Sequence, residues 1–468
     1  MNFLSLSILI GVLFLSACDV SALTASPVLL TPTAPPRATL SPVPQPPYRE
    51  TVYYVATNGN NAHTGTLTQP WLTIQKCLDQ VQPGDTCEIL EGTYAEALIL
   101  KFSGMPAARI TLKNHNGQVV TVNSGSAKTI VTGGRVDYYT IDGLNLIASF
   151  VPENQSDASI NLGKNVPFSR TDKTAGNHGF VLRNCYIEGA IYFHGHSNLV
   201  ENCEFNGKNL YKNALMDNYA SSYDNVYRNN TLYDYTVRGI WSKEATHNIL
   251  IEGNTIHDVQ HGIDCDGAFV PVSNCKVINN QVYNIGASEW GSGIFLENCF
   301  YCVIQGNTIH DIHDGAGIYA INYGNGDSTN WYTFDKIEYR NQRVNIRVSN
   351  NLIYNYQTSA GVYVTSVNGL VIDQNTFYTL SAIPAIGLHT EQDAKGVSYA
   401  PKDETITNNI FFGKGVKWFS PTTGLFSSGN FEGDPWFLNH PVDFRLKTNS
   451  PACTAGVGGR YAGAFPCQ

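Results

Sequence analysis

The stretch Ile249-Leu250-Ile251-Glu252-Gly253-Asn254-Thr255-Ile256 carries the pattern that decides the fold. It reads apolar, any, apolar, any, any, Asn, any, apolar, and it recurs along the chain. Further copies, some of them loose, occupy Val226–Leu232, Cys275–Val282, Cys302–Ile309, Ile346–Ile353, Leu370–Phe377 and Glu404–Phe411. Two earlier copies have Cys185 and Cys203 in place of Asn. The anchor positions are therefore 185, 203, 230, 254, 280, 307, 351, 375 and 409, and most of the spacings between them are 24–27 residues.

A repeat of about 25 residues with strand-type alternation predicts a solenoid in which each turn adds short strands to parallel sheets. Equivalent residues then stack at about 4.8 Å from turn to turn. A buried Asn in such a stack can bond the backbone and the Asn of the next turn. We therefore expect Asn254, Asn280 and Asn307 to be buried and hydrogen-bonded in one domain of about a dozen turns. The two longest spacings indicate loops inserted at roughly residues 322–345 and 392–403.

The composition excludes several classes of protein. Only 14% of the 468 residues are charged, 43% are hydrophobic and the net charge is −9. The chain is too apolar to be disordered, and it has no Lys/Arg cluster of the kind that binds nucleic acid. The sequence has only three Met and few Lys/Glu/Ala-rich stretches, which argues against a helical bundle.

The first fifty residues predict export and anchoring. Residues 3–15 are an apolar run, too short to span a membrane, that leads to Leu15-Ser16-Ala17-Cys18. These four residues resemble the lipobox of bacterial lipoproteins, which implies a signal peptide over 1–17, a lipid on Cys18 and an extracytoplasmic protein anchored to the cell envelope. An ordinary cleaved signal is the alternative. Residues 18–50 are rich in Pro, Thr and Ser and are expected to form an extended tether.

The other ten cysteines suit an oxidising compartment. Short spacings predict local disulfides, Cys77 with Cys87 and Cys453 with Cys467. The repeat should stack two further pairs that could also be bridged. These pairs are Cys185 with Cys203 and Cys275 with Cys302, which leaves Cys265 and Cys299 unassigned.

Both ends of the repeat region carry recognisable motifs. They are Tyr53-Tyr54-Val55-Ala56-Thr57-Asn58-Gly59, Pro70–Lys76, Pro83-Gly84-Asp85-Thr86, Glu91-Gly92-Thr93-Tyr94, Asp434-Pro435-Trp436-Phe437 and Asp443-Phe444-Arg445-Leu446. With the repeat, residues 51–468 resemble the right-handed parallel β-helix superfamily of pectate-lyase-like folds. The resemblance implies an all-β solenoid with an N-terminal helix cap. We expect a β-helix domain over 51–440 and a C-terminal cap over 441–468.

A second column of strands lies between the Asn phrases, and most of its copies begin with Gly and an aliphatic residue, as in Gly239-Ile240 and Gly262-Ile263. The aliphatic residue should point inward, so the third and fifth residues point outward. The third residues are Tyr192, Met216, Trp241, Asp264, Phe295, Tyr319, Tyr363 and His389. The fifth residues are His194, Asn218, Lys243, Asp266, Glu297, Ile321, Thr365 and Glu391.

The charged members of these columns predict a catalytic site on three successive turns. The candidate catalytic residues are Lys243, Asp266 and Glu297, with Asp264 beside them. Flanking side chains would bind sugars, with aromatic rings as stacking platforms. The candidates for this role are His194, Trp241, Phe295, Tyr319, Tyr363, His389 and Glu391, and an inserted loop with Trp331 and Tyr332 would wall the groove. The alternative is a solvated face with ordinary ion pairs.

Three functions fit this pattern, and we favour the first over the two alternatives. The first is β-elimination of an acidic polysaccharide, in which Ca²⁺ held by Asp264, Asp266 and Glu297 neutralises a uronate and Lys243 is the base. Several lyases of the fold resemble this scheme. The second is glycoside hydrolysis by two of the acids, since Asp266 and Glu297 on adjacent turns suit a short carboxyl separation. The third is a non-catalytic glycan-binding or envelope protein. We expect a monomer whose partner is a polysaccharide and whose membrane contact is the lipid alone.

Overall fold

The computed structural model describes residues 48, 50–125, 128–148, 160–162, 176–218, 220–268, 270–287, 290–322, 342–392, 396–413 and 422–467. Cys18, the signal and tether region up to residue 47, and Trp331 and Tyr332 lie outside the described residues. None of the helices in the described part has the length and apolar character needed to cross a membrane.

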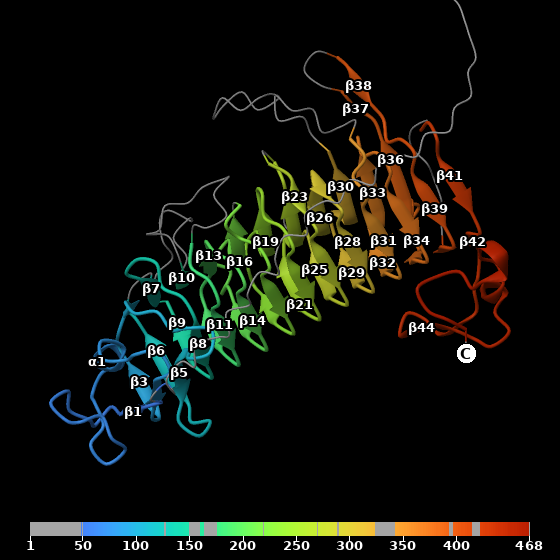
Figure 1. Ribbon diagram of the computed structural model, residues 1–468. Coiled ribbons are helices and arrows are strands. Elements are labelled where there is room, and N and C mark those ends of the chain that lie inside the picture. The colour runs from blue at the N-terminus through green and yellow to red at the C-terminus, as the bar shows by residue number, and fades with distance from the viewer. Residues whose placement is uncertain are drawn as a thin grey trace, which may run out of the picture. The chain divides into compact units, whose positions relative to one another are not determined.

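Three long parallel sheets form the domain, and most turns add one strand to each sheet in the order first, second, third (Figure 1). The 14-stranded first sheet contains β1 (Val52–Val55), β2 (Thr86–Ile89), β5 (Ile110–Asn114), β8 (Tyr139–Asp142), β11 (Val181–Arg183), β14 (Leu199–Glu201), β17 (Val226–Arg228), β20 (Leu250–Glu252), β24 (Lys276–Ile278), β28 (Val303–Gln305), β31 (Arg347–Ser349), β34 (Val371–Asp373), β39 (Thr405–Thr407) and β41 (Phe426–Ser428). The 13-stranded second sheet contains β3 (Gly92–Tyr94), β6 (Val120–Asn123), β9 (Asn145–Ile147), β12 (Tyr186–Glu188), β15 (Glu204–Asn206), β18 (Thr231–Tyr233), β21 (Thr255–Val259), β25 (Gln281–Ile285), β29 (Thr308–Ile312), β32 (Leu352–Tyr356), β35 (Thr376–Thr379), β40 (Ile410–Gly413) and β42 (Phe431–Glu432). The 11-stranded third sheet contains β4 (Leu98–Leu100), β7 (Ile130–Thr132), β10 (Ile160–Leu162), β13 (Ile191–Phe193), β16 (Asn213–Asn218), β19 (Arg238–Lys243), β22 (His261–Asp266), β26 (Gly291–Glu297), β30 (Gly315–Ile321), β33 (Val362–Thr365) and β36 (Ile386–His389).

Three short pairs complete the strands: β23 (Val272–Ser273) with β27 (Cys299–Phe300), β37 (Glu391–Gln392) with β38 (Ser398–Tyr399), and β43 (Phe437–Asn439) with β44 (Asp443–Leu446). The β37–β38 hairpin occupies the second of the predicted insertions. The predicted right-handed β-helix is thus confirmed as an all-β solenoid of stacked parallel strands, with almost no helix.

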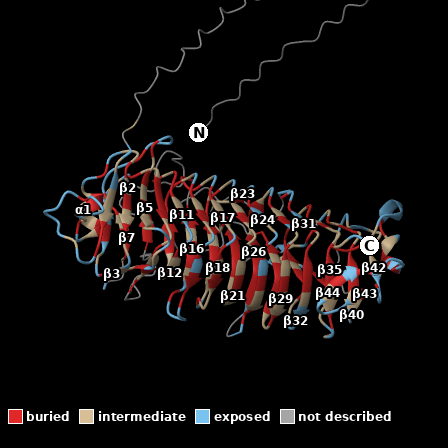
Figure 2. Ribbon diagram, turned by 90° about the horizontal axis from the view of Figure 1, so that it is seen from below, coloured by how far each residue is buried: buried red, intermediate tan, exposed pale blue. Residues whose placement is uncertain are grey.

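The Asn ladder is confirmed. Asn280 is 1% exposed, and its Oδ1 accepts hydrogen bonds from the backbone N–H and Nδ2 of Asn254 at 2.9 and 3.0 Å. Asn307 does the same for Asn280, and the ladder continues to Asn430. The buried column Ile240, Ile263, Ile294, Ile318 and Val362 is also as expected. Buried residues run along the strands, while exposed ones gather in the turns (Figure 2).

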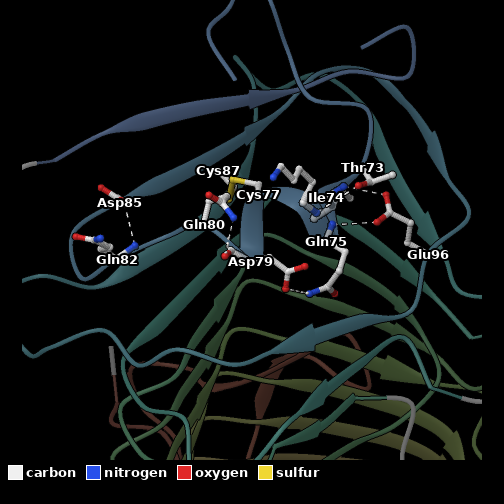
Figure 3. Close-up of a disulfide and its surroundings, with 11 residues drawn as sticks. Thr73, Ile74, Gln75, Cys77, Asp79, Gln80, Gln82, Asp85, Cys87 and Glu96 are labelled. Carbon is white, nitrogen blue, oxygen red and sulfur yellow. Dashed lines mark hydrogen bonds between the residues drawn. A yellow bond between two sulfur atoms is a disulfide. The ribbon is translucent and has the colours of Figure 1, made fainter. Parts of the chain in front are cut away.

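A short helix caps the N-terminal end, as the resemblance implied. Helix α1 (Ile74–Leu78) begins after Thr73, whose hydroxyl accepts a hydrogen bond from the Lys76 N–H. The Glu96 carboxylate accepts from the first two helical N–H groups, at 2.9 and 3.0 Å. Acceptors at a helix start satisfy otherwise unpaired donors. The Cys77–Cys87 disulfide ties α1 to β2 (Figure 3).

The C-terminal cap begins slightly before the expected boundary. The antiparallel hairpin β43–β44 already spans residues 437–446, and the 3-10 helices η1 (Pro451–Cys453) and η2 (Val457–Gly459) follow it. Residues of the cap pack with the last turns in a separate hydrophobic cluster. The predicted Cys453–Cys467 disulfide closes the cap.

The expected pairing of the inner cysteines is wrong. Cys275 and Cys302 do stack next to one another, directly before β24 and β28. Each is bridged to another cysteine, however: Cys275 to Cys265, and Cys302 to Cys299. These bridges close short sequence separations of 10 and 3 residues. Cys185 and Cys203 stack as predicted but are free and buried, and their side chains hydrogen-bond to each other.

Candidate active site

The candidate site lies on the third sheet, where β19, β22 and β26 are consecutive strands; β19 and β26 are labelled in Figure 1. The register places Lys243 opposite Asp266, and Asp266 opposite Glu297. It also places Asp264 next to Trp241 on one side and to Phe295 on the other. The structure therefore brings the four predicted charged residues to one face on three successive turns.

Glycines fix this register. A Cβ on Gly262 would lie 2.5 Å from the carbonyl oxygen of Gly293, and a Cβ on Gly239 would lie 2.7 Å from that of Gly262. Real Cβ atoms do not approach backbone oxygen so closely, so only glycine lets the turns stack here. Because each glycine precedes an inward Ile, the outward residues follow at fixed offsets, and their side chains align across the turns.

Two acids at the centre of the site share a hydrogen bond. The side chains of Asp266 and Glu297 bond to each other, and the Asp266 oxygens also accept hydrogen bonds from Trp241 Nε1 at 2.9 Å and from the Ala268 N–H at 3.1 Å. Burial raises the pKa of Glu297 well above its usual value, and the charges of Asp266 and Asp264 raise it further, against an opposing effect of Lys243. Two close carboxyls cannot both ionise easily, so Glu297 holds its proton more tightly than an isolated glutamic acid does.

Two cations flank the Trp241 ring. Arg238 Cζ lies 4.2 Å and Lys243 Nζ lies 4.6 Å from the ring centroid, within cation–π range. Arg238 Nε donates to Asp264 Oδ2 at 2.5 Å, and the Asp264 side chain is fully buried. Lys243 Nζ lies 3.4 Å from Glu244 Oε1. The site thus combines an acid with a raised pKa, further carboxylates and two cations held at the Trp241 ring.

His261 completes the described cluster. Its Nδ1 lies 3.1 Å from Ser292 Oγ and 3.9 Å from Asp264 Oδ1, and its ring centroid is 6.2 Å from that of Phe295. Burial lowers the pKa of His261, outweighing the opposing effect of the Asp264 charge, so the ring is uncharged near neutral pH. Sequence reasoning missed Arg238 and His261. The signal was present, because each stands directly before the Gly of its phrase.

The described acids do not fit the predicted Ca²⁺ site. Asp264 is already paired with Arg238, and Asp266 is held by Trp241, by the Ala268 N–H and by Glu297. Within the described residues, no group of three or more His, Cys, Asp or Glu side chains is arranged to hold a metal ion.

An aromatic track runs from the acids toward the C-terminal turns. The ring centroids of Phe295 and Tyr319 are 5.4 Å apart, those of Tyr319 and Tyr363 are 5.2 Å apart, and those of Tyr363 and His389 are 5.8 Å apart. The first three are half-buried and His389 is exposed. His194, on the far side of the acids, is instead buried and packs on Tyr192 at 4.3 Å.

Two predicted positions at the end of this track are corrected. β36 pairs with β33 so that His389 faces Thr365 rather than Tyr363, two residues away from the expected register. Ile386 and Leu388 are both buried, so either could be read from sequence as the first inward residue. Glu391 lies beyond β36 in the β37–β38 hairpin, where its Oε2 accepts a hydrogen bond from Ser366 Oγ.

Comparison with known proteins agrees with this architecture. The model of the family described as "Right handed beta helix region" matches residues 173–331 and 271–432. The solved complex of XylC with xylose superposes with a TM-score of 0.55 at 12% identity, over 82% of this chain and 87% of that one. A GH136 lacto-N-biosidase from Eubacterium ramulus superposes with a TM-score of 0.52 at 11% identity, over 80% and 68%.

A curated relative from Bacillus subtilis (strain 168), the uncharacterized protein YwoF, is 34% identical over 73 residues. That match spans 16% of this chain and 16% of the relative. At such low identity the two solved structures establish the fold alone. The family matches together span more than half of the sequence, and the chain belongs to the right-handed beta-helix family.

Proposed function

We propose that this chain is a carbohydrate-active enzyme that hydrolyses glycosidic bonds, with Glu297 as the proton donor and Asp266 as its carboxylate partner. The observation that carries the proposal is the side-by-side placement of these acids on adjacent strands, where burial and the charges of Asp266 and Asp264 raise the pKa of Glu297 well above its usual value. Pairs of carboxyl groups whose environments separate their protonation states are typical of acid–base catalysis. The lacto-N-biosidase and the xylose complex give independent support that this fold accommodates carbohydrate.

The spacing favours retention of configuration. The two acids stand on adjacent turns whose backbones are about 4.8 Å apart, and substrate entry would part their side chains to the about 5–5.5 Å that separates the carboxyl groups of retaining enzymes. In the first step Asp266 attacks the anomeric carbon, and the Glu297 proton moves to the leaving oxygen as the glycosidic bond breaks. In the second, water gives a proton to Glu297, and its oxygen bonds to the anomeric carbon as the ester to Asp266 breaks.

The surrounding residues would hold the sugars. Phe295 and Tyr319 are half-buried on adjacent turns and would stack against sugar rings beside the acids. Trp241 Nε1 fixes the Asp266 carboxylate, so this side chain would position the nucleophile. A glycan of about four sugars would then lie along the turns, over the aromatic track.

Cleavage of an acidic polysaccharide by β-elimination is the second candidate. The observation that favours it is the pair of cations on Trp241, because Arg238 supplies a charge for a uronate carboxylate that sequence reasoning had not found. Lys243 would take the proton beside that carboxylate, and the bond to the leaving oxygen would break as the ring becomes unsaturated. The pairing of Arg238 with Asp264 argues against this candidate, since the guanidinium is already neutralised.

Product analysis on a panel of acidic and neutral polysaccharides distinguishes the candidates. Hydrolysis predicts fragments that each gain one water and carry reducing ends, and Glu297→Gln should abolish them. Elimination predicts unsaturated uronate ends that Lys243→Ala abolishes. Absence of both products, with glycan binding intact in both variants, would favour a non-catalytic binding protein instead.

The location of the chain is proposed on separate grounds. The disulfides of the described region indicate a protein that folds outside the cytoplasm. We propose that a lipid on Cys18 anchors it as a monomer to the envelope of a bacterial cell. Labelling with radioactive palmitate should mark the full-length chain and fail to mark Cys18→Ser.

A further inference from the structure

A cavity of about 490 Å³ opens on the outside of the second sheet, at its C-terminal end. Side chains from the ends of β29, β32 and β35 line it on one side, and Pro441 of the C-terminal hairpin lines it on the other. The candidate active site lies on the third sheet, so the two are on different sheets of the solenoid. We propose that this cavity is a second carbohydrate-binding site, selective for neutral oligosaccharides, that holds a glycan apart from the candidate active site.

The polar side of the cavity is built from groups that suit sugar hydroxyls. Asp311 Oδ2 pairs with His310 Nδ1 at 2.8 Å, and Asn355 Nδ2 donates to Asp311 Oδ1. The remaining lone pairs of this oriented carboxylate can accept from hydroxyl groups. Gln357 is exposed at the cavity and offers both an amide donor and an acceptor. These groups would bond hydroxyls from several directions.

The apolar side is exposed and preformed. Leu380 is 74% exposed at the cavity, although it is a large apolar side chain. The Tyr378 ring packs against the rings of Phe412 and His440, and the centroid distances are 5.2 and 5.3 Å respectively. The hairpin that carries Pro441 belongs to the cap closed by a disulfide. An apolar wall opposite hydrogen-bonding groups matches the two faces of a sugar ring.

Charge selects the class of ligand. Among the described residues that line the cavity, Asp311 is the acid, and no Lys, Arg or His side chain is present. Because the His310 ring is already paired with Asp311, a uronate or sulfated sugar would meet the Asp311 charge without a Lys or Arg partner in the lining. At the candidate active site, by contrast, Arg238 and Lys243 provide positive charge. The volume falls in the about 300–1,000 Å³ range of small-ligand sites, which fits a short oligosaccharide.

Calorimetric titration tests the site with xylohexaose, cellohexaose and mannohexaose as neutral probes and an oligogalacturonate as the acidic probe. The protein is full-length Glu297→Gln, so that the probes are not cleaved. At least one neutral probe should bind, and adding Leu380→Ala with Gln357→Ala should weaken it at least tenfold. Both residues are exposed, so the fold should be retained, which circular dichroism checks.

Matched changes outside the cavity supply the control. Val442 is 82% exposed beside Pro441 without lining the cavity, and Gln305 is exposed on the first sheet. Val442→Ala with Gln305→Ala should leave the affinity within twofold. No binding by any neutral probe, equal weakening by both pairs of substitutions, or preference of the cavity for oligogalacturonate would each overturn the proposal. None of these outcomes depends on whether Glu297 is catalytic.

Discussion

Replacing Asn280 with Leu should destabilise the solenoid locally. Asn280 occupies the middle of the ladder, where its Oδ1 accepts from the Asn254 N–H at 2.9 Å and its Nδ2 donates to Ile251 O and to Asn307 Oδ1, both at 3.0 Å. Leucine has a similar size but can neither accept nor donate. The Asn254 N–H is then left buried without its acceptor.

The magnitude follows from these contacts. A buried donor left unpaired costs about 1–3 kcal/mol, and each lost hydrogen bond contributes about 1 kcal/mol net. With partial relaxation of the neighbouring turns, the free energy of unfolding should fall by about 2–4 kcal/mol. Gln281→Leu in the same turn is the matched control, because Gln281 is exposed and a change there should stay within about 0.5 kcal/mol.

Guanidinium denaturation followed by circular dichroism measures the difference between the two variants. Long repeat arrays need not unfold in one step, so amide hydrogen exchange around Asn254 should be followed as well. Faster exchange there in Asn280→Leu, with little change in Gln281→Leu, is expected. Equal stability and equal exchange in the two variants would refute the reasoning about the ladder.

Three further outcomes are expected. Burial raises the pKa of Asp217 to about 6 from a usual 3.8, so its stabilising contribution is full below pH 4 and is lost as the pH rises through about 6. The free energy of unfolding should fall by about 3 kcal/mol over that range, and Asp217→Asn should remove this pH dependence in denaturation curves. Thiol titration without reductant should find Cys185 and Cys203 unreactive in the native protein and reactive after denaturation; their resistance after denaturation would show a bridge. Trp241→Phe should lower kcat through the lost hydrogen bond to Asp266 by about tenfold while preserving stacking, and an unchanged kcat would remove Trp241 from the positioning role.

The sequence was most informative where one residue type recurs at a fixed place in every turn. The recurring Asn, as at Asn254 and Asn280, predicted the ladder because a buried amide has few other uses. The Gly–Ile phrase predicted that its Ile points inward and that the third and fifth residues of the strand point outward. From that pattern the side-by-side placement of Lys243, Asp266 and Glu297 followed without coordinates. Which side chains stack on neighbouring turns depends only on the strand register, and the positions of the repeat in the sequence predict that register.

Features that depend on geometry across a turn could not be predicted in this way. Cys265 pairs with Cys275 across the interior, which depends on the path of the backbone between two sheets rather than on spacing. Arg238 reaches the acids by the length of its side chain. The predicted register of His389 was wrong by two residues. Both Ile386 and Leu388 of its strand are aliphatic, so the sequence did not show which of them is the first inward residue.

The protonation state of Glu297 tests the central claim most directly. Infrared difference spectroscopy between the wild-type protein and Glu297→Gln at pH 7 isolates the vibrations of this carboxyl group. We expect a protonated carboxylic acid band that is present in the wild type, absent in the variant and lost from the wild type only well above the pH at which a glutamic acid usually ionises, because the pKa of Glu297 is raised. A difference spectrum that shows only a carboxylate at pH 7 would contradict the acid–carboxylate pair and, with it, the proposed hydrolytic mechanism.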